Sequence, residues 1–189
     1  MTAHDVTRLA HAWIAPALAP GALAVDATAG AGHDTLFLAA AVGDTGRVHA
    51  FDIQADAIAR SRERVAAAGL SNRVSWHATC HSLAPERIGR VAVNAVMFNL
   101  GWLPGGDHTL VTRPATTRLA LDALTHRLCP GGRLSVIAYR GHEGGTEEER
   151  AVHDWFGRLP GTVMPLVERA ASASPRAPVL RVVERGNVP

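Results

Sequence analysis

Lysine is absent from this sequence, and cysteine, tyrosine and long apolar runs are scarce. All 19 basic residues are arginines and 17 residues are acidic, so the formal net charge is only +2. A field this weak does not hold nucleic acid by bulk attraction, although a local basic surface would. Cys80 and Cys129 signal neither a disulfide framework nor a zinc site, which indicates a reducing cytoplasm. No apolar run reaches the roughly 18 residues that span a membrane, so no membrane association is expected.

What remains is the composition of a compact globular protein. Hydrophobic residues make up 47% of the chain and charged residues 19%, a balance in which burial can offset the loss of chain entropy. A length of 189 residues fits a single domain over residues 1–189. Residues 1–20 are expected to form an N-terminal helix that leads into the first strand.

Strand-like and helix-like segments alternate through most of the chain. Strands are expected at residues 22–28, 47–53, 74–79, 92–99, 133–139, 164–170 and 179–185. Helices are expected at residues 6–18, 34–42, 54–68 and 114–128, and again from residue 146, where Thr146 and Glu149 predict a capping box. This alternation is typical of an α/β fold with an open, mostly parallel sheet, which binds ligands beyond the carboxyl ends of its strands.

A glycine turn between the first strand and the following helix predicts an adenosine cofactor. In VDATAGAGHDTLFLA, Gly30 and Gly32 permit a tight turn whose amides can meet a negative group. Asp52 ends the next strand, 22 residues after Gly30, where a carboxylate can accept hydrogen bonds from both ribose hydroxyls.

Two departures from the dinucleotide fingerprint decide between cofactors. Thr35 stands where the third small residue is expected, and Asp26 precedes the glycines. An acid would repel a pyrophosphate, whereas S-adenosylmethionine offers an ammonium that pairs with a carboxylate. The pattern therefore favours S-adenosylmethionine over NAD. The alternative role for Asp26 is local, accepting backbone amides to orient the loop.

Several longer strings together resemble one methyltransferase family. They are VDATAGAGHDTLFLA, VHAFDIQADAI, His81-Ser82, MFNLGWLPGGDH with the later Thr116-Thr117, and YRGHEGGTEEERAV. The chain resembles, over nearly its whole length, the class I S-adenosylmethionine-dependent methyltransferases of the Putative rRNA methylase family. Two departures are Ala31, in place of an Asn, and SPRAPVLRVVE, which keeps only part of an Asn-Pro-Pro pattern and leaves the substrate-side wall undefined.

The resemblance implies both a fold and a reaction. The fold is Rossmann-like, with a seven-stranded, mostly parallel sheet, an antiparallel last strand and helices on both faces. The reaction is N-methylation of 5-aminomethyl-2-thiouridine at the tRNA wobble position, which yields the 5-methylaminomethyl nucleoside and S-adenosylhomocysteine. Alternatives are methylation of rRNA or of a small amine, and a non-catalytic nucleotide- or RNA-binding module.

The expected site residues follow the loops at the strand ends. Cofactor-binding residues are expected to be Asp26, Ala27, Thr28, Gly30, Gly32, His33, Asp34, Thr35, Asp52, Ile53, Gln54, His81 and Asn99. Substrate-binding residues are expected to be Leu100, Gly101, Trp102, Pro104, Gly105, Gly106, Arg113, Thr116, Thr117, Tyr139, Arg140, Gly141, His142 and Gly144.

Methyl transfer to an amine mainly requires alignment of a neutral nitrogen lone pair with the methyl group. Asn99 is the leading positioning residue, with capping of the strand end as its alternative role. Asp107, His81 and His142 are the groups that could accept the ammonium proton. The histidines lack HxH or HExxH spacing, so no metal is expected.

A tRNA anticodon stem-loop, or rRNA as the alternative, is the expected partner. Arg113, Arg118 and Arg140 flank the loops, and Trp102 or Tyr139 could stack on an extruded base. A homodimer is compatible with the sequence.

Overall fold

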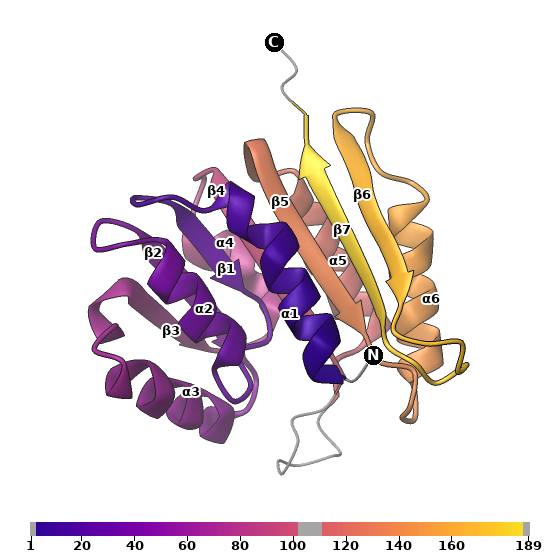
Figure 1. The fold of residues 1–189 in the computed structure, drawn as a ribbon, viewed down its shortest axis with the longest axis horizontal. Helices are drawn as coiled ribbons and strands as arrows, with labels where there is room; N and C mark the ends of the chain where they lie inside the picture. Colours follow the sequence, from indigo (N-terminus) through magenta and orange to yellow (C-terminus); the bar gives the residue numbers. More distant parts are fainter. Residues whose placement is uncertain (1–2, 102–110, 187–189) are drawn as a thin grey trace.

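The computed structural model describes residues 3–101 and 111–186, which form a seven-stranded sheet between two layers of helices (Figure 1). The strand order is β3-β2-β1-β4-β5-β7-β6. The strands are β1 (Leu23–Asp26), β2 (Arg47–Asp52), β3 (Val74–Ala78), β4 (Val93–Leu100), β5 (Leu128–Ala138), β6 (Val163–Ala170) and β7 (Val179–Arg185). Strands β1 to β5 pair in parallel, and β7 runs antiparallel to both of its neighbours, β5 and β6.

Helices cover both faces of the sheet. The α-helices are α1 (Ala3–Ile14), α2 (His33–Ala41), α3 (Ala55–Ala67), α4 (Ala84–Ile88), α5 (Pro114–Thr125) and α6 (Gly145–Phe156). Short 3₁₀ turns occupy Ala15–Ala17, Ser71–Arg73 and His81–Leu83. Helices α1 to α3 pack on one face and α4 to α6 on the other (Figure 1). No helix within the described residues is long and apolar enough to cross a membrane.

The central strand β4 shows why the sheet needs both layers. Its sequence VNAVMFNL is almost continuously apolar, as expected for a parallel strand that is buried on both faces. Because side chains alternate along a strand, Val96 and Phe98 join the core beneath α5 and α6, whereas Ala95 and Met97 join the core beneath α1 and α2.

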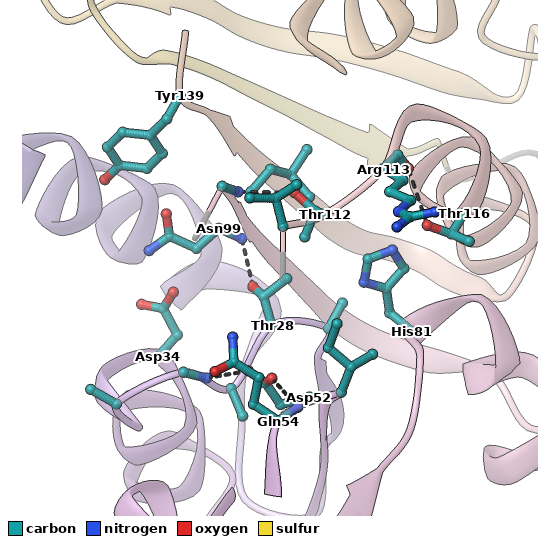
Figure 2. A pocket seen from close by; sticks show the side chains of 18 of the residues that line it. Thr28, Asp34, Asp52, Gln54, His81, Asn99, Thr112, Arg113, Thr116 and Tyr139 are labelled. Atoms are coloured by element: carbon teal, nitrogen blue, oxygen red, sulfur yellow. Dashed lines mark hydrogen bonds between the residues drawn. The ribbon is translucent and has the colours of Figure 1, made fainter. Parts of the chain in front are cut away.

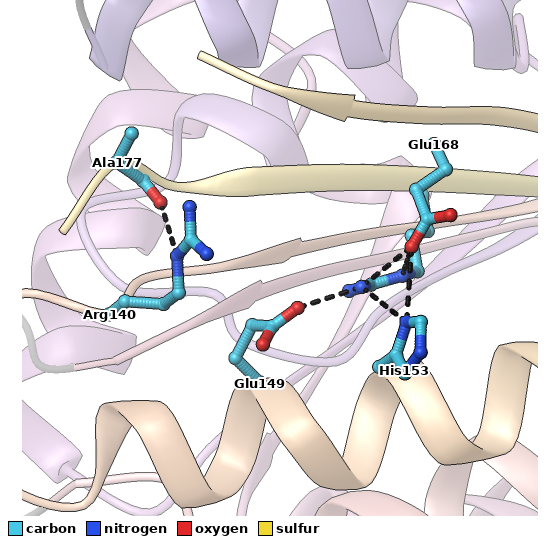
Figure 3. Close-up of polar contacts among 6 residues, drawn as sticks. Arg140, Glu149, His153, Glu168 and Ala177 are labelled. Atoms are coloured by element: carbon cyan, nitrogen blue, oxygen red, sulfur yellow. Dashed lines mark hydrogen bonds and ion pairs between the residues drawn. The ribbon is translucent and has the colours of Figure 1, made fainter. Parts of the chain in front are cut away.

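A buried arginine ties α6 to the antiparallel end of the sheet (Figure 3). Arg181 of β7 is 2% exposed. Its guanidinium lies 2.7 Å from Glu149 of α6 and 2.8 Å from Glu168 of β6. His153 of α6 also contacts Glu168, at 3.2 Å. Burial of the charge is tolerated because two carboxylates neutralise it.

The predicted Rossmann-like fold, with its antiparallel last strand, is confirmed, and two local predictions are wrong. The fifth helix ends at Thr125, and the Cys-Pro-Gly-Gly segment belongs to β5, where the register against β4 shifts after Val93. Gly131 has a φ of +74°, which lets the strand bend at that shift. The capping box does not form either, because α6 begins at Gly145 after the left-handed Gly144 and has no side-chain cap.

Candidate functional site

A pocket of about 670 Å³ opens at the carboxyl ends of β1, β2, β4 and β5. It lies where the strand order reverses between β1 and β4, the place where open α/β sheets bind ligands. Its volume is in the range of small-molecule sites. Asp34, Asn99 and Tyr139 lie along one side, His81, Arg113 and Thr116 lie along the other, and Asp52 and Gln54 lie at the base of the view in Figure 2.

Hydrogen bonds to Asp52 attach the glycine loop to the end of β2. The Oδ2 atom of Asp52 accepts a hydrogen bond from the amide of Gly30 at 2.9 Å, and its Oδ1 atom accepts one from the amide of Gln54, also at 2.9 Å. Burial raises the pKa of Asp52, while three backbone amides oppose that shift. Since a carboxylate has about four acceptor positions, Asp52 can still accept bonds from a ligand diol.

The Asp26 carboxylate does not line the pocket. Its Oδ1 atom accepts a bond from the Thr28 amide at 3.1 Å, and its Oδ2 atom accepts one from the Thr35 hydroxyl at 2.5 Å. The side chain is fully buried. The structure therefore gives Asp26 the local role of holding the loop, because the tight turn points an amide and a hydroxyl at it.

Burial raises the pKa of Asp26 to about 7, with a smaller contribution from the negative charge of Asp34. An unfolded aspartate titrates near 3.8, so the folded protein holds this proton more tightly. The stability that Asp26 contributes is complete below about pH 4 and is lost as the pH rises to about 7.

Because asparagine does not titrate, Asp26→Asn should remove this pH dependence. Its melting temperature minus that of the wild type should rise between about pH 4 and pH 7 and then level off. Thermal unfolding of both proteins without cofactor, across this pH range, checks this. A pH-independent difference for Asp26→Asn would contradict the assignment.

The N-terminal helix supports the pocket wall from behind, through a contact to Asp34 that the sequence did not predict. His11 of α1 places its Nε2 atom 2.6 Å from Oδ1 of Asp34, and its ring stacks on Phe37 with centroids 4.0 Å apart. Asp34 is 5% exposed and lines the pocket. No local pattern marks His11, because its partner lies 23 residues away in the chain.

The end of β4 is joined to the glycine loop and to α6. The backbone amide of Asn99 donates to the Thr28 hydroxyl at 2.7 Å, which leaves the Asn99 side chain in the pocket wall. The Gly101 amide donates to the Thr112 hydroxyl at 3.0 Å, and that hydroxyl donates to Glu148 at 2.5 Å. The buried Glu148 thus holds both chain segments in place, a role that no local sequence pattern predicts.

Burial decides what the two candidate histidines can do. Burial lowers the pKa of His81 to about 4, although the carbonyl of Ala27 opposes the shift. A neutral imidazole of such low basicity does not take a proton from an ammonium at neutral pH. His142 does not line the pocket; it packs behind Gly101, and its Nδ1 atom lies 2.8 Å from the carbonyl of Glu143.

Most of the expected site residues converge on this one pocket. The cofactor candidates in its wall are Ala27, Thr28, Gly30, His33, Asp34, Asp52, Ile53, Gln54, His81 and Asn99. The substrate candidates in its wall are Leu100, Gly101, Arg113, Thr116, Tyr139 and Gly141. The wall also contains residues that were not expected: Ala29, Ala31, Cys80, Val111, Thr112 and Arg176.

Other candidates lie elsewhere. The expected residues that do not line the pocket are Asp26, Gly32, Thr35, Thr117, Arg140, His142 and Gly144. Thr117 donates a hydrogen bond to Glu148, and Arg140 donates one to the carbonyl of Ala177. Arg118 forms an ion pair with Asp122 on α5. Trp102, Pro104, Gly105, Gly106 and Asp107 lie outside the described residues. Within residues 3–101 and 111–186, no group of three or more histidine, cysteine or acidic side chains could hold a metal ion.

A model of the family described as Putative rRNA methylase matches residues 48–184. The chain belongs to this family. An Arabidopsis thaliana relative described as "tRNA (mnm(5)s(2)U34)-methyltransferase, chloroplastic" is 37% identical over 183 residues, covering 92% of this chain and 67% of the relative.

Two solved structures are similar over nearly the whole chain. A Clostridium thermocellum protein described as a putative rRNA-methylase is 35% identical, with a TM-score of 0.91 and coverage of 98% of this chain and 100% of that one. A Streptococcus mutans protein, described as a putative methyltransferase in complex with SAH, is 29% identical, with a TM-score of 0.85 and coverage of 95% and 97%.

This rRNA methylase family member is an S-adenosylmethionine-dependent methyltransferase. The predicted family and cofactor are thereby confirmed. The residues present fit the cofactor, because the pocket contains one carboxylate held against a glycine turn and a second carboxylate near Asn99. Gly30 has a φ of +50°, a left-handed conformation that suits glycine at this tight turn.

Proposed function

We propose that this methyltransferase converts 5-aminomethyl-2-thiouridine to 5-methylaminomethyl-2-thiouridine at the wobble position of tRNA. The proposal is carried by the placement of Asn99 in the same pocket as the glycine turn, in a chain 37% identical to a relative named for that modification. The reaction needs an amine held in line with the methyl group, and the amide of Asn99 is a suitable hydrogen-bond partner.

Two carboxylates would hold the cofactor. Asp52 would accept hydrogen bonds from the ribose hydroxyls, as the sequence predicts, while Asp34 would take the ammonium role first considered for Asp26. Asp34 suits this role because it is the other acidic side chain in the described wall. The bound cofactor supplies a methyl group on a sulfonium, which needs no metal or redox step.

Asn99 would orient the substrate amine by accepting a hydrogen bond from its N–H. The Thr28 hydroxyl fixes the Asn99 backbone at 2.7 Å, so the side chain starts from a defined position. The aminomethyl group loses a proton to solvent before transfer, then its nitrogen bonds to the methyl carbon as the carbon–sulfur bond breaks. The product is first a secondary ammonium, which then loses a second proton to solvent and becomes a neutral secondary amine.

Nucleoside mass spectrometry tests the proposed reaction. Purified protein and methyl-labelled S-adenosylmethionine are incubated with tRNA that carries unmethylated 5-aminomethyl-2-thiouridine, and with rRNA in parallel. A labelled 5-methylaminomethyl nucleoside is expected from the tRNA. The family description favours rRNA as the second candidate substrate, so label confined to rRNA would replace the tRNA proposal. If the protein binds S-adenosylmethionine but releases no S-adenosylhomocysteine with tRNA, with rRNA or with small amines, a non-catalytic module would be supported.

A further inference from the structure

The charged side chains in the pocket wall are divided by sign. Asp34 and Asp52 come from the β1 and β2 half of the sheet, whereas Arg113 and Arg176 come from the opposite half. Figure 2 shows Arg113 across the pocket from Asp34. A cofactor with an ammonium and a diol suits the acidic side. The arginine side is therefore available to a different ligand with negative charge.

Arg113 is presented by the start of α5. It is the N-cap residue, directly before Pro114, and its side chain is exposed. The hydroxyl of Thr116 donates to its backbone carbonyl at 3.1 Å, which fixes the chain where the side chain leaves it. Among the described residues, no carboxylate pairs with the Arg113 guanidinium.

Arg176 comes from the turn between β6 and β7, the segment that the sequence left undefined. The Ala171 amide donates to the Pro178 carbonyl at 2.9 Å and closes the turn. Arg140 donates from Nε to the carbonyl of Ala177 at 2.8 Å (Figure 3). Ala171 and Ala177 are both buried in the core. The exposed Arg176 side chain therefore projects from a well-anchored turn, and no described carboxylate pairs with it.

We propose that Arg113 and Arg176 bind phosphate groups of the RNA chain next to the target nucleotide. This inference rests on the proposed function, because it requires a polynucleotide substrate. A guanidinium presents a planar fork of donors that matches a phosphate, and it stays charged at any working pH. Two such groups at the pocket rim supply the local basic surface that a net charge of +2 does not provide.

Binding of RNA at several salt concentrations tests the phosphate contacts. Fluorescence anisotropy with a fluorescein-labelled anticodon stem-loop is measured for Arg176→Ala and Arg113→Ala. Each variant should bind roughly tenfold more weakly and lose about 0.7 from the slope of log K against log salt, as expected for one phosphate contact on single-stranded RNA. Arg176→Lys should keep most of the slope, because lysine still neutralises a phosphate.

Arg158→Ala is the matched control. Arg158 is an exposed arginine just beyond α6, outside the pocket wall, so its loss removes the same charge elsewhere. Its affinity and salt slope should equal those of the wild type. Calorimetric affinity for S-adenosylhomocysteine should be unchanged in all four variants.

Several outcomes would overturn the phosphate contacts. An unchanged salt slope in Arg176→Ala would do so, and so would weaker binding of S-adenosylhomocysteine, which would place the arginine on the carboxylate of the cofactor. Methylation of tRNA with the KM of the wild type in Arg176→Ala would refute the contact and leave the proposed function standing. Arginine-dependent RNA binding without formation of the methylaminomethyl nucleoside would refute the proposed function alone.

Discussion

Asp52→Ala is expected to lower the affinity for S-adenosylhomocysteine at least about 100-fold, since two hydrogen bonds from ribose to a charged acceptor contribute about 3 kcal/mol or more. The same change removes the acceptor for the Gly30 amide, so the glycine turn also loses its attachment to β2. Isothermal titration calorimetry measures the affinity directly.

Two further variants separate cofactor binding from loop support. Asp52→Asn keeps the size of the side chain and one of the two acceptor oxygens, so it retains one of the two backbone amide bonds. Its melting temperature should therefore fall less than that of Asp52→Ala, while its affinity for S-adenosylhomocysteine still falls. Asp56→Ala removes an exposed acid from the first turn of α3 and should bind normally. Wild-type affinity in both Asp52 variants would show that the cofactor binds elsewhere.

Gly32→Ala is expected to lose about 3 kcal/mol of unfolding free energy and at least about tenfold in cofactor affinity. The residue has a φ of +82°, and an added Cβ would lie 2.6 Å from Oγ and 2.7 Å from Cα of Ser61. One of these atoms belongs to the backbone of α3, so the helix must move away from the turn. Urea denaturation and calorimetry with S-adenosylhomocysteine measure the two effects.

Gly69 offers a matched control for the backbone conformation. Its φ is +72°, and nothing lies within 4 Å of where a Cβ would be. Gly69→Ala should therefore lose only the roughly 1 kcal/mol that the left-handed conformation costs, and should bind the cofactor normally. Equal losses of unfolding free energy in Gly32→Ala and Gly69→Ala would mean that the close approach of α3 to the glycine turn does not contribute to stability.

The sequence predicted those features that depend on short segments of chain. Periodicity and turn residues gave seven strands in the correct order along the chain, because each strand carries its own apolar pattern. The spacing of Gly30 and Asp52 also predicted that both lie at the ends of neighbouring strands, since one βα unit separates them by a nearly fixed length, but it did not predict the hydrogen bond between them. Such relations need no knowledge of the rest of the fold.

The features that were missed depend on contacts between distant segments. Arg176 reaches the pocket only because β7 inserts between β5 and β6, and Glu148 meets Thr112 across 36 residues of sequence. For Asp26 the sequence left two roles open, an ammonium partner and a local acceptor that holds the loop, and the structure shows the local contacts. Its residue type and spacing suited an ammonium partner, but spacing does not say which way a side chain points. In the structure the carboxylate accepts hydrogen bonds from the Thr28 amide and the Thr35 hydroxyl.

The place of β7 in the sheet affects the order in which the site can form during translation, which runs from the N-terminus to the C-terminus. β7 is translated after β6, yet every pairing of β6 in the described sheet is with β7. A nascent chain that stops before residue 179 can assemble β1 to β5, but it gives β6 no partner and α6 no Arg181. The rim that carries Arg176 is therefore the part of the site that forms late, after the cofactor side has all of its strands.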